Sequence, residues 1–587
     1  MVKKLMESIR EQKKNSILAM VTISGEVVFE VIIPLLMANL IDYGIDMGDM
    51  GYIVKMGIVL LLSALGQLFC GAISGKFAAI ASSGFARNLR HDMFYKVQNY
   101  SFSNIDKFST ASIVTRLTTD VTNLQNTYQM IIRMAVRSPL MAIFSLVAAF
   151  GIDTKLSLIF LAIIPVLILG LYFIMTRTHP IFERVFRTYD KLNSVVQENL
   201  HGIRVVKSFV REDHENKKFT GISENIYKDF KKAEQQLAWN APLMQLCMYA
   251  AVLLLSWFGA RTIVACGGDA ATGLSTGELL SLLSYATQIL MSLMGLSMIF
   301  VMLTMSRTSG ERVVELLNET PDITTPENAV KSVPDGSIDF EHVQFSYRHG
   351  TEGKPVLSDI NLHIPRGAPV GVIGGTGSSK SSFVQLIPRL YDVDLGAVKV
   401  GGIDVRKYDL DTLRGDVAMV LQKNVLFSGT IKDNLRWGDE NATDEEILHA
   451  CQLAQADDFI QTFPKGYDTY IEQGGTNVSG GQKQRLCIAR ALLKKPKILI
   501  LDDSTSAVDT RTDALIRGAF AKEIPNTTKI IIAQRIASVQ EADIILVLDD
   551  GKIVSCGTHD ELMQTSPIYR EVYESQTKGD PDNATAS

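Results

Sequence analysis

The stretch from Val370 to Ser382 combines the residue types that bind a phosphate chain. An apolar run, Val370–Ile373, has the pattern of a buried strand, and a turn through glycines leads from it into an apolar helical pattern over Ser382–Ile387. In such a unit the glycines let backbone N–H groups approach phosphate oxygens, and the helix N-terminus adds positive potential. The residues expected to contact a nucleotide here are Gly374, Gly375, Thr376, Gly377, Ser378, Ser379, Lys380, Ser381 and Ser382.

Two side chains of this loop have specific chemistry. Lys380 is spaced to reach the β- and γ-phosphates, and the Ser381 hydroxyl is spaced to ligate Mg²⁺. The pattern Gly-x4-Gly-Lys-Ser/Thr is matched except that Ser379 stands where the second glycine belongs. A flexible Gly/Ser loop without a ligand is the alternative interpretation of this imperfect match.

Two downstream segments favour the nucleotide site. The apolar run Ile498–Leu501 ends in Asp502 and Asp503, and such carboxylates hold Mg²⁺ beside a P-loop. Before it, residues 477–485 read Asn-Val-Ser-Gly-Gly-Gln-Lys-Gln-Arg. This segment resembles the signature motif of the ATP-binding cassette (ABC) family, so ATP and Mg²⁺ are the expected cofactors.

The resemblance assigns roles to further residues. Tyr347, which closes the alternating strand pattern of 338–347, matches the aromatic residue that stacks on adenine in this family. Gln422 follows an apolar strand and matches the Q-loop glutamine, which contacts Mg²⁺ or water, while Asp509 matches the family's Ser-Ala-Val-Asp motif. The resemblance thus implies a metal site at Ser381, Gln422 and Asp502. The signature residues, which in this family contact the γ-phosphate of ATP bound to the other nucleotide domain, are Ser479, Gly480, Gly481 and Gln482.

Three positions depart from the pattern of hydrolysing family members. Asp503 stands where the general base is normally Glu, and it is about one methylene shorter, although a base must lie within roughly 2.6–3.2 Å of its proton. Gln534 replaces a histidine that can share a proton, and Ser379 replaces the loop glycine. The chain therefore resembles the degenerate-site subunit of a heterodimeric bacterial multidrug-type exporter. In such a pair its signature completes the competent site of a different subunit.

The composition predicts a membrane protein. The chain has 587 residues, 47% of them hydrophobic, and its mean hydropathy is positive, which is unusual for a soluble enzyme. A membrane-spanning helix needs roughly 20 apolar residues. The candidate spans are Ile17–Ala38, Ile53–Ile73, Met130–Phe150, Leu156–Ile174, Leu243–Val264 and Leu279–Met305. The predicted fold class is an α-helical membrane domain of exporter type fused to an α/β P-loop domain.

The loop charges predict an orientation. Segments 3–14, 76–116 and 176–232 are rich in Lys and Arg, whereas 42–51 and 266–278 contain none. By the positive-inside rule, both termini are cytoplasmic in the plasma membrane. The net charge of -5 and the absence of a basic run make nucleic acid an unexpected partner.

The long inner loops also resemble those of ABC exporters, at Ser112–Val121 and Leu200–Glu212. In that family, short transverse coupling helices dock on the nucleotide domains, and we expect them near Thr118–Asn123 and Arg211–Glu215. Six spans followed by a cassette on one chain are typical of an exporter half rather than of an importer.

The domain boundaries follow from composition. We expect a transmembrane domain over 1–318, a polar, proline-rich linker over 319–336, a nucleotide-binding domain over 337–574 and a disordered tail over 575–587. The six cysteines are scattered without metal-ligand spacing, as for free thiols in a reduced compartment.

Two acidic residues of the first span, Glu26 and Glu30, share one helix face. Carboxylates within a membrane face a protein interior or a water-filled path. They either contact a cationic or polar substrate or form a structural pair with neighbouring helices. The sequence leaves open whether small molecules, lipids or peptides are transported. It also leaves open an ATP-regulated gate or sensor without active transport, and a homodimeric exporter that uses Asp503 as its base.

Overall fold

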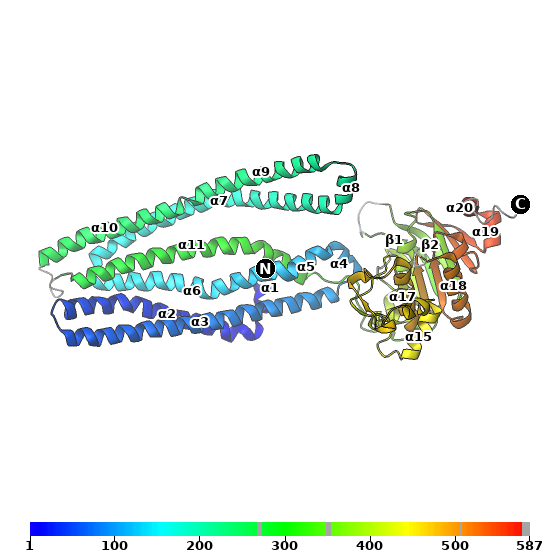
Figure 1. Ribbon diagram of the computed structural model, residues 1–587, viewed down its shortest axis with the longest axis horizontal. Coiled ribbons are helices and arrows are strands. Elements are labelled where there is room, and N and C mark those ends of the chain that lie inside the picture. The colour runs from blue at the N-terminus through cyan, green and yellow to red at the C-terminus, as the bar shows by residue number, and fades with distance from the viewer. Residues whose placement is uncertain (267–272, 348–353, 504–507, 578–587) are drawn as a thin grey trace. The chain divides into compact units, whose positions relative to one another are not determined.

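The computed structural model describes residues 1–266, 273–347, 354–503 and 508–577 (Figure 1). The chain forms two compact units. The helical unit comprises Met1–Gln98 and Thr110–Glu319, and the sheet unit comprises Asn99–Ser109 and Thr320–Ser587. The predicted disordered tail begins at Ser575, but the last helix continues to Thr577, and residues 578–587 lie outside the described part.

The helical unit contains six helical stretches that are long and apolar enough to cross a membrane. They are Arg10–Ile45, Met50–Gln98, Thr110–Ile152, Thr154–His201, Glu212–Ala265 and Thr276–Asn318. Each contains one of the predicted spans, so the prediction of six apolar helices is confirmed. A helix satisfies its own backbone hydrogen bonds, which an apolar bilayer requires.

Within these stretches, short π-helical turns over Ile41–Ile45 and Arg116–Asp120 interrupt or extend regular helices. The helices are α1 (Val2–Glu7), α2 (Lys13–Leu40), α3 (Met50–Gln98), α5 (Thr110–Thr115), α6 (Val121–Ile152), α7 (Thr154–His201), α8 (Ile203–Ser208), α9 (Glu212–Leu237), α10 (Asn240–Cys266) and α11 (Thr276–Asn318). In Figure 1, α2 runs beside α3, α6 beside α11, and α7 beside α9 and α10.

A buried polar network joins the π-helical turn before α6 to α11. The fully buried Asp120 accepts hydrogen bonds from Ser309, at 2.8 Å, and from Arg312. Arg116 donates to the Arg312 carbonyl at 2.6 Å and pairs with Glu315 at 2.9 Å. Buried charges are tolerated when they are paired and hydrogen-bonded in this way. The network fixes this segment within the helical unit.

The prediction of a short transverse helix near Thr118–Asn123 is wrong, because this segment is part of the continuous helical stretch Thr110–Ile152. Instead α4 (Phe102–Lys107) packs within the sheet unit, where Asp106 accepts a 2.6 Å hydrogen bond from the Tyr391 hydroxyl. Phe102 contacts the same ring, with centroids 6.1 Å apart.

The N-terminus of α4 is held by hydroxyl groups. Ser101 caps the helix in a reciprocal box with Asn104, and Ser101 and Ser103 both donate to Asp322. In the second long loop, α8 precedes the expected coupling position. Residues 209–211 form the turn, and α9 begins at Glu212.

The sheet unit contains a six-stranded sheet of order β12-β11-β3-β10-β9-β6, a four-stranded sheet of order β2-β1-β4-β5 and a small β7-β8 pair. The strands are β1 (Ile338–Phe345), β2 (Leu357–Ile364), β3 (Pro369–Gly374), β4 (Leu395–Val400), β5 (Ile403–Asp404), β6 (Val417–Val420), β7 (Gly429–Thr430), β8 (Tyr470–Ile471), β9 (Ile498–Asp502), β10 (Thr528–Ile532), β11 (Ile544–Asp549) and β12 (Lys552–Gly557). The helices, besides α4, are α12 (Lys380–Gln385), α13 (Leu410–Asp416), α14 (Ile431–Leu435), α15 (Asp444–Leu453), α16 (Asp457–Gln461), α17 (Gly480–Leu493), α18 (Thr510–Glu523), α19 (His559–Thr565) and α20 (Pro567–Thr577).

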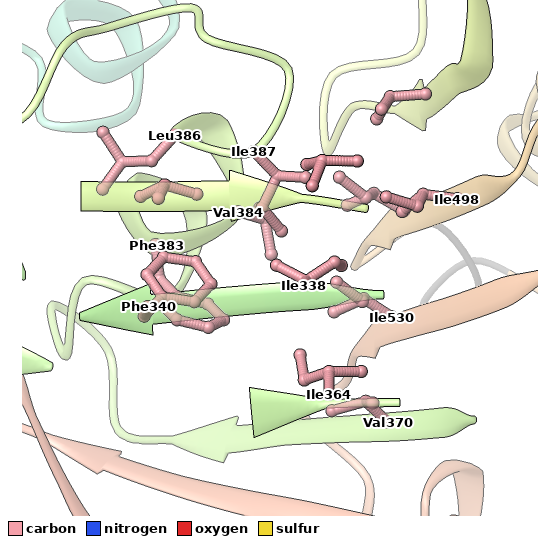
Figure 2. Close-up of a cluster of buried hydrophobic side chains, with 14 of the residues drawn as sticks. Ile338, Phe340, Ile364, Val370, Phe383, Val384, Leu386, Ile387, Ile498 and Ile530 are labelled. Atoms are coloured by element: carbon pink, nitrogen blue, oxygen red, sulfur yellow. The ribbon is translucent and has the colours of Figure 1, made fainter. Parts of the chain in front are cut away.

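The main core of the sheet unit contains side chains from both larger sheets and from α12 and the turn after it (Figure 2). Phe383 of α12 stacks on Phe340 of β1 with ring centroids 4.4 Å apart. Ile498 and Ile530, from the parallel strands β9 and β10, are also fully buried in it. Parallel strands that are covered on both faces read as continuous apolar runs, which is why the sequence identified them.

Candidate functional site

The topology of the six-stranded sheet collects the predicted site residues at one edge. Strands β3, β10, β9 and β6 are adjacent and parallel, so their carboxyl ends meet at that edge. The glycine loop follows β3, Gln534 follows β10, Asp502 ends β9 and Gln422 follows β6. Ligands of open α/β sheets bind outside the carboxyl ends of the strands.

The loop between β3 and α12 is fixed at both ends. A Cβ atom on Gly374 would lie 2.2 Å from the Leu548 carbonyl oxygen of β11, so only glycine fits there. Gly377 has φ +84°, in the left-handed region that glycine adopts readily. At the other end, Phe383 and Val384 of α12 are fully buried, which anchors the helix that follows the loop.

Ser379, which replaces the second motif glycine, is held in the left-handed region at φ 70° and ψ 23°. A left-handed conformation costs a residue other than glycine roughly 1–2 kcal/mol. The departure therefore keeps the backbone shape that glycine would give, at a cost in stability. The loop retains its fold, and the substitution introduces local strain.

The Lys380 ammonium group lies over the loop. Its Nζ donates to the carbonyl oxygens of Gly374 and Gly375, both at 2.8 Å, and to the Ser378 hydroxyl at 3.3 Å. Burial lowers the pKa of Lys380, while the charges of Asp502 and Asp503 act in the opposite direction. The cation therefore lies close to both carboxylates at the end of β9.

Asp502 and Ser381 lie together, as a divalent-cation site requires. Asp502 is 4% exposed, and this burial raises its pKa, which the Asp503 charge also favours. The hydrogen bond from the Ser381 hydroxyl and the charge of Lys380 oppose that rise. A hydroxyl and a buried carboxylate are oxygen ligands that suit Mg²⁺, which takes few protein ligands and keeps waters and phosphate oxygens. The residues present fit this ion.

Asp503 forms a cluster with the two glutamines of this edge. Its Oδ2 accepts from Gln534 Nε2 at 2.7 Å and from Gln422 Nε2 at 3.4 Å. The residue has φ 48°, is 9% exposed, and donates its backbone N–H to the Ile532 carbonyl at 3.1 Å. The carboxylate at the position of a catalytic base is therefore bonded to two side-chain amides. No sequence pattern predicted this direct contact.

Tyr347 lies beside the same loop. Its hydroxyl is 2.8 Å from Ser382 Oγ and 3.4 Å from Gln385 Oε1, both on α12. The ring meets Phe345 and Tyr391 edge-on, at centroid distances of 4.9 and 5.1 Å. The side chain remains 45% exposed, so the ring is fixed in orientation and still accessible.

The signature segment forms the N-terminus of α17. Ser479 and Gln482 make a reciprocal capping box, in which the Gln482 N–H donates to Ser479 Oγ at 3.3 Å and the Ser479 N–H donates to Gln482 Oε1 at 2.9 Å. Ser479 and Gly480 are exposed, and Gly481 and Gln482 are half-buried. Among the described residues, these hydrogen bonds of Ser479 and Gln482 thus stay within the segment rather than joining it to the glycine loop.

Asp509 caps α18, where it accepts the Thr512 N–H at 2.9 Å. The hydrogen bonds from Thr512 lower the pKa of Asp509. Residues 504–507, which include Ser506 and Ala507 of the predicted Ser-Ala-Val-Asp motif, lie outside the described residues.

In the helical unit, Glu26 and Glu30 approach a residue that the sequence analysis missed. Arg137 of α6 pairs with Glu30 at 2.7 Å and with Glu26 at 3.8 Å. Arg133 and Arg137 both lie in the predicted third span, one turn apart, and a basic pair inside an apolar run could have revealed them. The geometry matches the structural-pair alternative for the two glutamates.

Comparisons with known proteins agree with this architecture. A family profile described as ABC transporter transmembrane region matches residues 16–293, and one described as ABC transporter matches 357–506. The chain is 36% identical over 559 residues to the Bacillus subtilis "Uncharacterized ABC transporter ATP-binding protein YfiB", covering 95% of this chain and 96% of that protein.

The name of a second relative includes a substrate. The "Fatty acid ABC transporter ATP-binding/permease protein" of Mycobacterium bovis is 32% identical, over 82% of this chain and 75% of that protein. Among solved structures, "Structure of a bacterial Atm1-family ABC exporter with ATP bound" matches with a TM-score of 0.82 and 22% identity. That match covers 96% of this chain and 99% of the other, and at this identity it shows a shared fold.

Proposed function

The chain belongs to the ABC transporters, as an exporter-type half-transporter that joins a six-helix membrane region to an ATPase domain, and from this we propose that it is one subunit of a heterodimer. Its own P-loop site binds MgATP and hydrolyses it poorly. Its signature helix completes the competent site on a different half-transporter. The pair exports small molecules, lipids or peptides from the cytoplasm.

The observation that carries this proposal is the bond between Gln534 and Asp503. A general base needs a lone pair aimed at the attacking water, and a neighbour that can accept or return a proton assists it. Here Oδ2 of Asp503 accepts amide N–H groups from Gln534 at 2.7 Å and Gln422 at 3.4 Å, and neither amide can take up a proton. The Asp503 carboxylate is thus hydrogen-bonded to two side-chain amides that cannot accept its proton. This arrangement supports slow ATP hydrolysis at this site.

Nucleotide binding is supported independently of hydrolysis. Lys380, whose Nζ lies over the loop carbonyls, is assigned to the β- and γ-phosphates, and Tyr347 to the adenine face. Mg²⁺, when bound, would neutralise phosphate charge. Ser381, Asp502 and Gln422 are the residues assigned to hold it.

The signature is assigned to a site on another chain. Its capping box satisfies Ser479 and Gln482, and the exposed Gly480 leaves room for a phosphate near the first turn of α17. A helix N-terminus with accessible N–H groups is a natural anion site. We assign Gly481 and Asp509 to the same interface between cassettes.

The location in the cell is that of a multi-pass plasma membrane protein. We propose that both termini are cytoplasmic and that the boundaries expected from composition, 1–318, 319–336 and 337–574, hold, except that the last helix extends the nucleotide-binding domain to Thr577. Labelling of a cysteine placed at Met47 from outside, and of one at Lys107 only from inside, tests the orientation. Labelling of the Lys107 position from outside would contradict it.

The fatty acid transporter among the relatives adds a long-chain carboxylate to the candidate substrates. An ATP-regulated gate would move substrate only down its gradient, whereas uphill transport by the reconstituted complex requires an exporter.

Purification of the native complex through a tag on this chain tests the heterodimer. The expected result is a one-to-one complex with a second half-transporter that has Glu after its Mg²⁺ carboxylate and His at the position of Gln534. Recovery of two copies of this chain as an active ATPase would overturn the proposal.

A further inference from the structure

The helical unit contains a cavity of about 360 Å³ whose lining is mostly one face of α6. That face contributes Arg133 and Arg137 one turn apart, together with Gln129, Met130 and Met134. Met302 of α11 closes another side. A ligand pocket is typically of this size, with an apolar lining and a few polar groups that fix orientation.

The two arginines of the cavity differ in their partners. Arg137 is paired with Glu30 at 2.7 Å and with Glu26 at 3.8 Å. Arg133 makes no hydrogen bond or ion pair to any residue that the structure describes, and its Nε is buried. Glu26 turns toward α3, where a Cβ on Gly71 would lie 2.9 Å from its Oε2. Both carboxylates thus lie within ion-pair distance of Arg137, although Glu26 Oε2 is buried without a hydrogen-bond partner. The Nε of Arg133 has no acceptor among the described residues.

The Nε of Arg133 is buried in a membrane-spanning helix without a partner, and a buried N–H donor that lacks an acceptor is costly. Such a group fits an acceptor that is not part of the described chain. The planar guanidinium matches carboxylate and phosphate groups, to which it can donate two parallel hydrogen bonds. The flexible methionines beside it accept apolar groups of varied shape.

We propose that this cavity binds the transported substrate and that the substrate is an amphipathic anion. Its carboxylate or phosphate head accepts hydrogen bonds from Arg133, and its apolar body lies against Met130, Met134 and Met302. The inference rests on the proposed export function and adds to it the substrate class. It also replaces the cationic substrate considered for Glu26 and Glu30, since both carboxylates lie within ion-pair distance of Arg137.

Equilibrium binding without ATP tests the proposal. The complete transporter, purified through a tag on this chain and placed in phosphatidylcholine nanodiscs, is titrated with radiolabelled dodecanoate. Dodecyl phosphate, dodecyltrimethylammonium and dodecanol, which share the tail, serve as competitors. The two anions should compete at concentrations about 10-fold lower than the cation or the alcohol. Preference for dodecyl phosphate over dodecanoate would identify a phosphate head, and the reverse order a carboxylate head. Equal competition by the cation would overturn the proposal.

Two substitutions separate a binding role from a structural one. Arg133→Met should weaken dodecanoate binding by about 10- to 100-fold, and Arg133→Lys by less, because it keeps the charge. Removing an unpaired charge should also raise the Tm of the ligand-free protein, by about 2 °C. Arg137→Met is the matched control and should lower the Tm, because it leaves Glu26 and Glu30 unpaired.

A fall in Tm for Arg133→Met, with unchanged dodecanoate binding, would mean that Arg133 pairs with a carboxylate of the partner subunit, and it would overturn the proposal. Dodecanoate binding does not depend on ATP hydrolysis. Failure of the binding test would therefore leave the proposed heterodimer intact, and failure of the heterodimer proposal would leave the binding result intact.

Discussion

The glycine-loop edge and the signature helix lie in the same sheet unit, yet they differ in how well they keep the motifs of the family. At the glycine-loop edge, Ser379 adopts a left-handed conformation and Asp503 is bonded to Gln422 and Gln534. At the signature, the capping box of Ser479 is complete and Gly480 is exposed. The departures are concentrated where the chain would act on its own nucleotide. The residues expected to act on a partner's nucleotide are intact.

The largest expected effect comes from Gly480→Asp. It places a side chain and a negative charge where a γ-phosphate would approach, and repulsion at short range with poor screening amounts to several kcal/mol. ATPase activity of the reconstituted complex should fall by at least about 100-fold. Asp503→Asn, measured in the same assay, should leave most of the activity.

The opposite result, in which Asp503→Asn is inactive and Gly480→Asp has a mild effect, would contradict the proposed difference between the glycine-loop edge and the signature helix. A homodimer that uses Asp503 as its base would then be the better description. Unchanged membrane extraction and assembly of both variants, checked by size-exclusion chromatography, is the control for folding.

A smaller effect is expected for Lys380→Ala. Loss of a charge-assisted contact to phosphate should weaken ATP binding at this chain's own site by about 10- to 100-fold. Turnover of the complex should nevertheless fall less than after the equivalent lysine substitution in the partner. Nucleotide titration and ATPase assays on both single variants measure the contrast, and equal losses of turnover would contradict it.

Restoring the carboxylate length should have little effect by itself. Asp503→Glu is expected to change ATPase activity by less than about 2-fold, because Gln534 still cannot share a proton. The double variant Asp503→Glu with Gln534→His should exceed both single variants. A gain from Asp503→Glu alone would show that the length of the side chain, and not Gln534, limits hydrolysis.

The smallest effect concerns the strained loop residue. Ser379→Gly should relieve the left-handed backbone cost of roughly 1–2 kcal/mol, while the greater freedom of glycine in the unfolded chain opposes this by roughly 0.4–1 kcal/mol. The net gain in the free energy of unfolding therefore lies between about 0 and 1.6 kcal/mol. Thermal unfolding of the complete complex, compared with Ser378→Gly as a control, measures it. A loss of stability would contradict the assignment of strain to Ser379.

The sequence predicted the elements whose signal is local and strong. The six long helices are apolar over the length that a membrane-spanning helix needs. Strands such as Ile498–Asp502 are continuous apolar runs because both of their faces are buried. The order of the motifs then predicted which residues meet at the sheet edge. This part of the fold needs only periodicity and parallel topology.

The contacts that sequence reasoning missed depend on packing between distant segments. Gln534 and Asp503 are 31 residues apart, and their 2.7 Å bond depends on the side-chain conformations at the ends of two neighbouring strands. The pairing of Arg137 with Glu30 spans 107 residues. The six-residue α4 is too short for a periodic signal, and tertiary contacts such as that between Asp106 and Tyr391 hold it in place.

The membership of Asn99–Ser109 in the sheet unit has a consequence for recombination between half-transporters. A chimera that exchanges only the C-terminal part after Glu319 would separate Tyr391 and Asp322 from the hydroxyl and carboxylate groups of Ser101, Ser103 and Asp106 that they contact. A chimera with a functional ATPase unit therefore requires that two segments of the chain be exchanged, Asn99–Ser109 and the part after Glu319. The eleven residues Asn99–Ser109 should therefore be exchanged together with the C-terminal ATPase region.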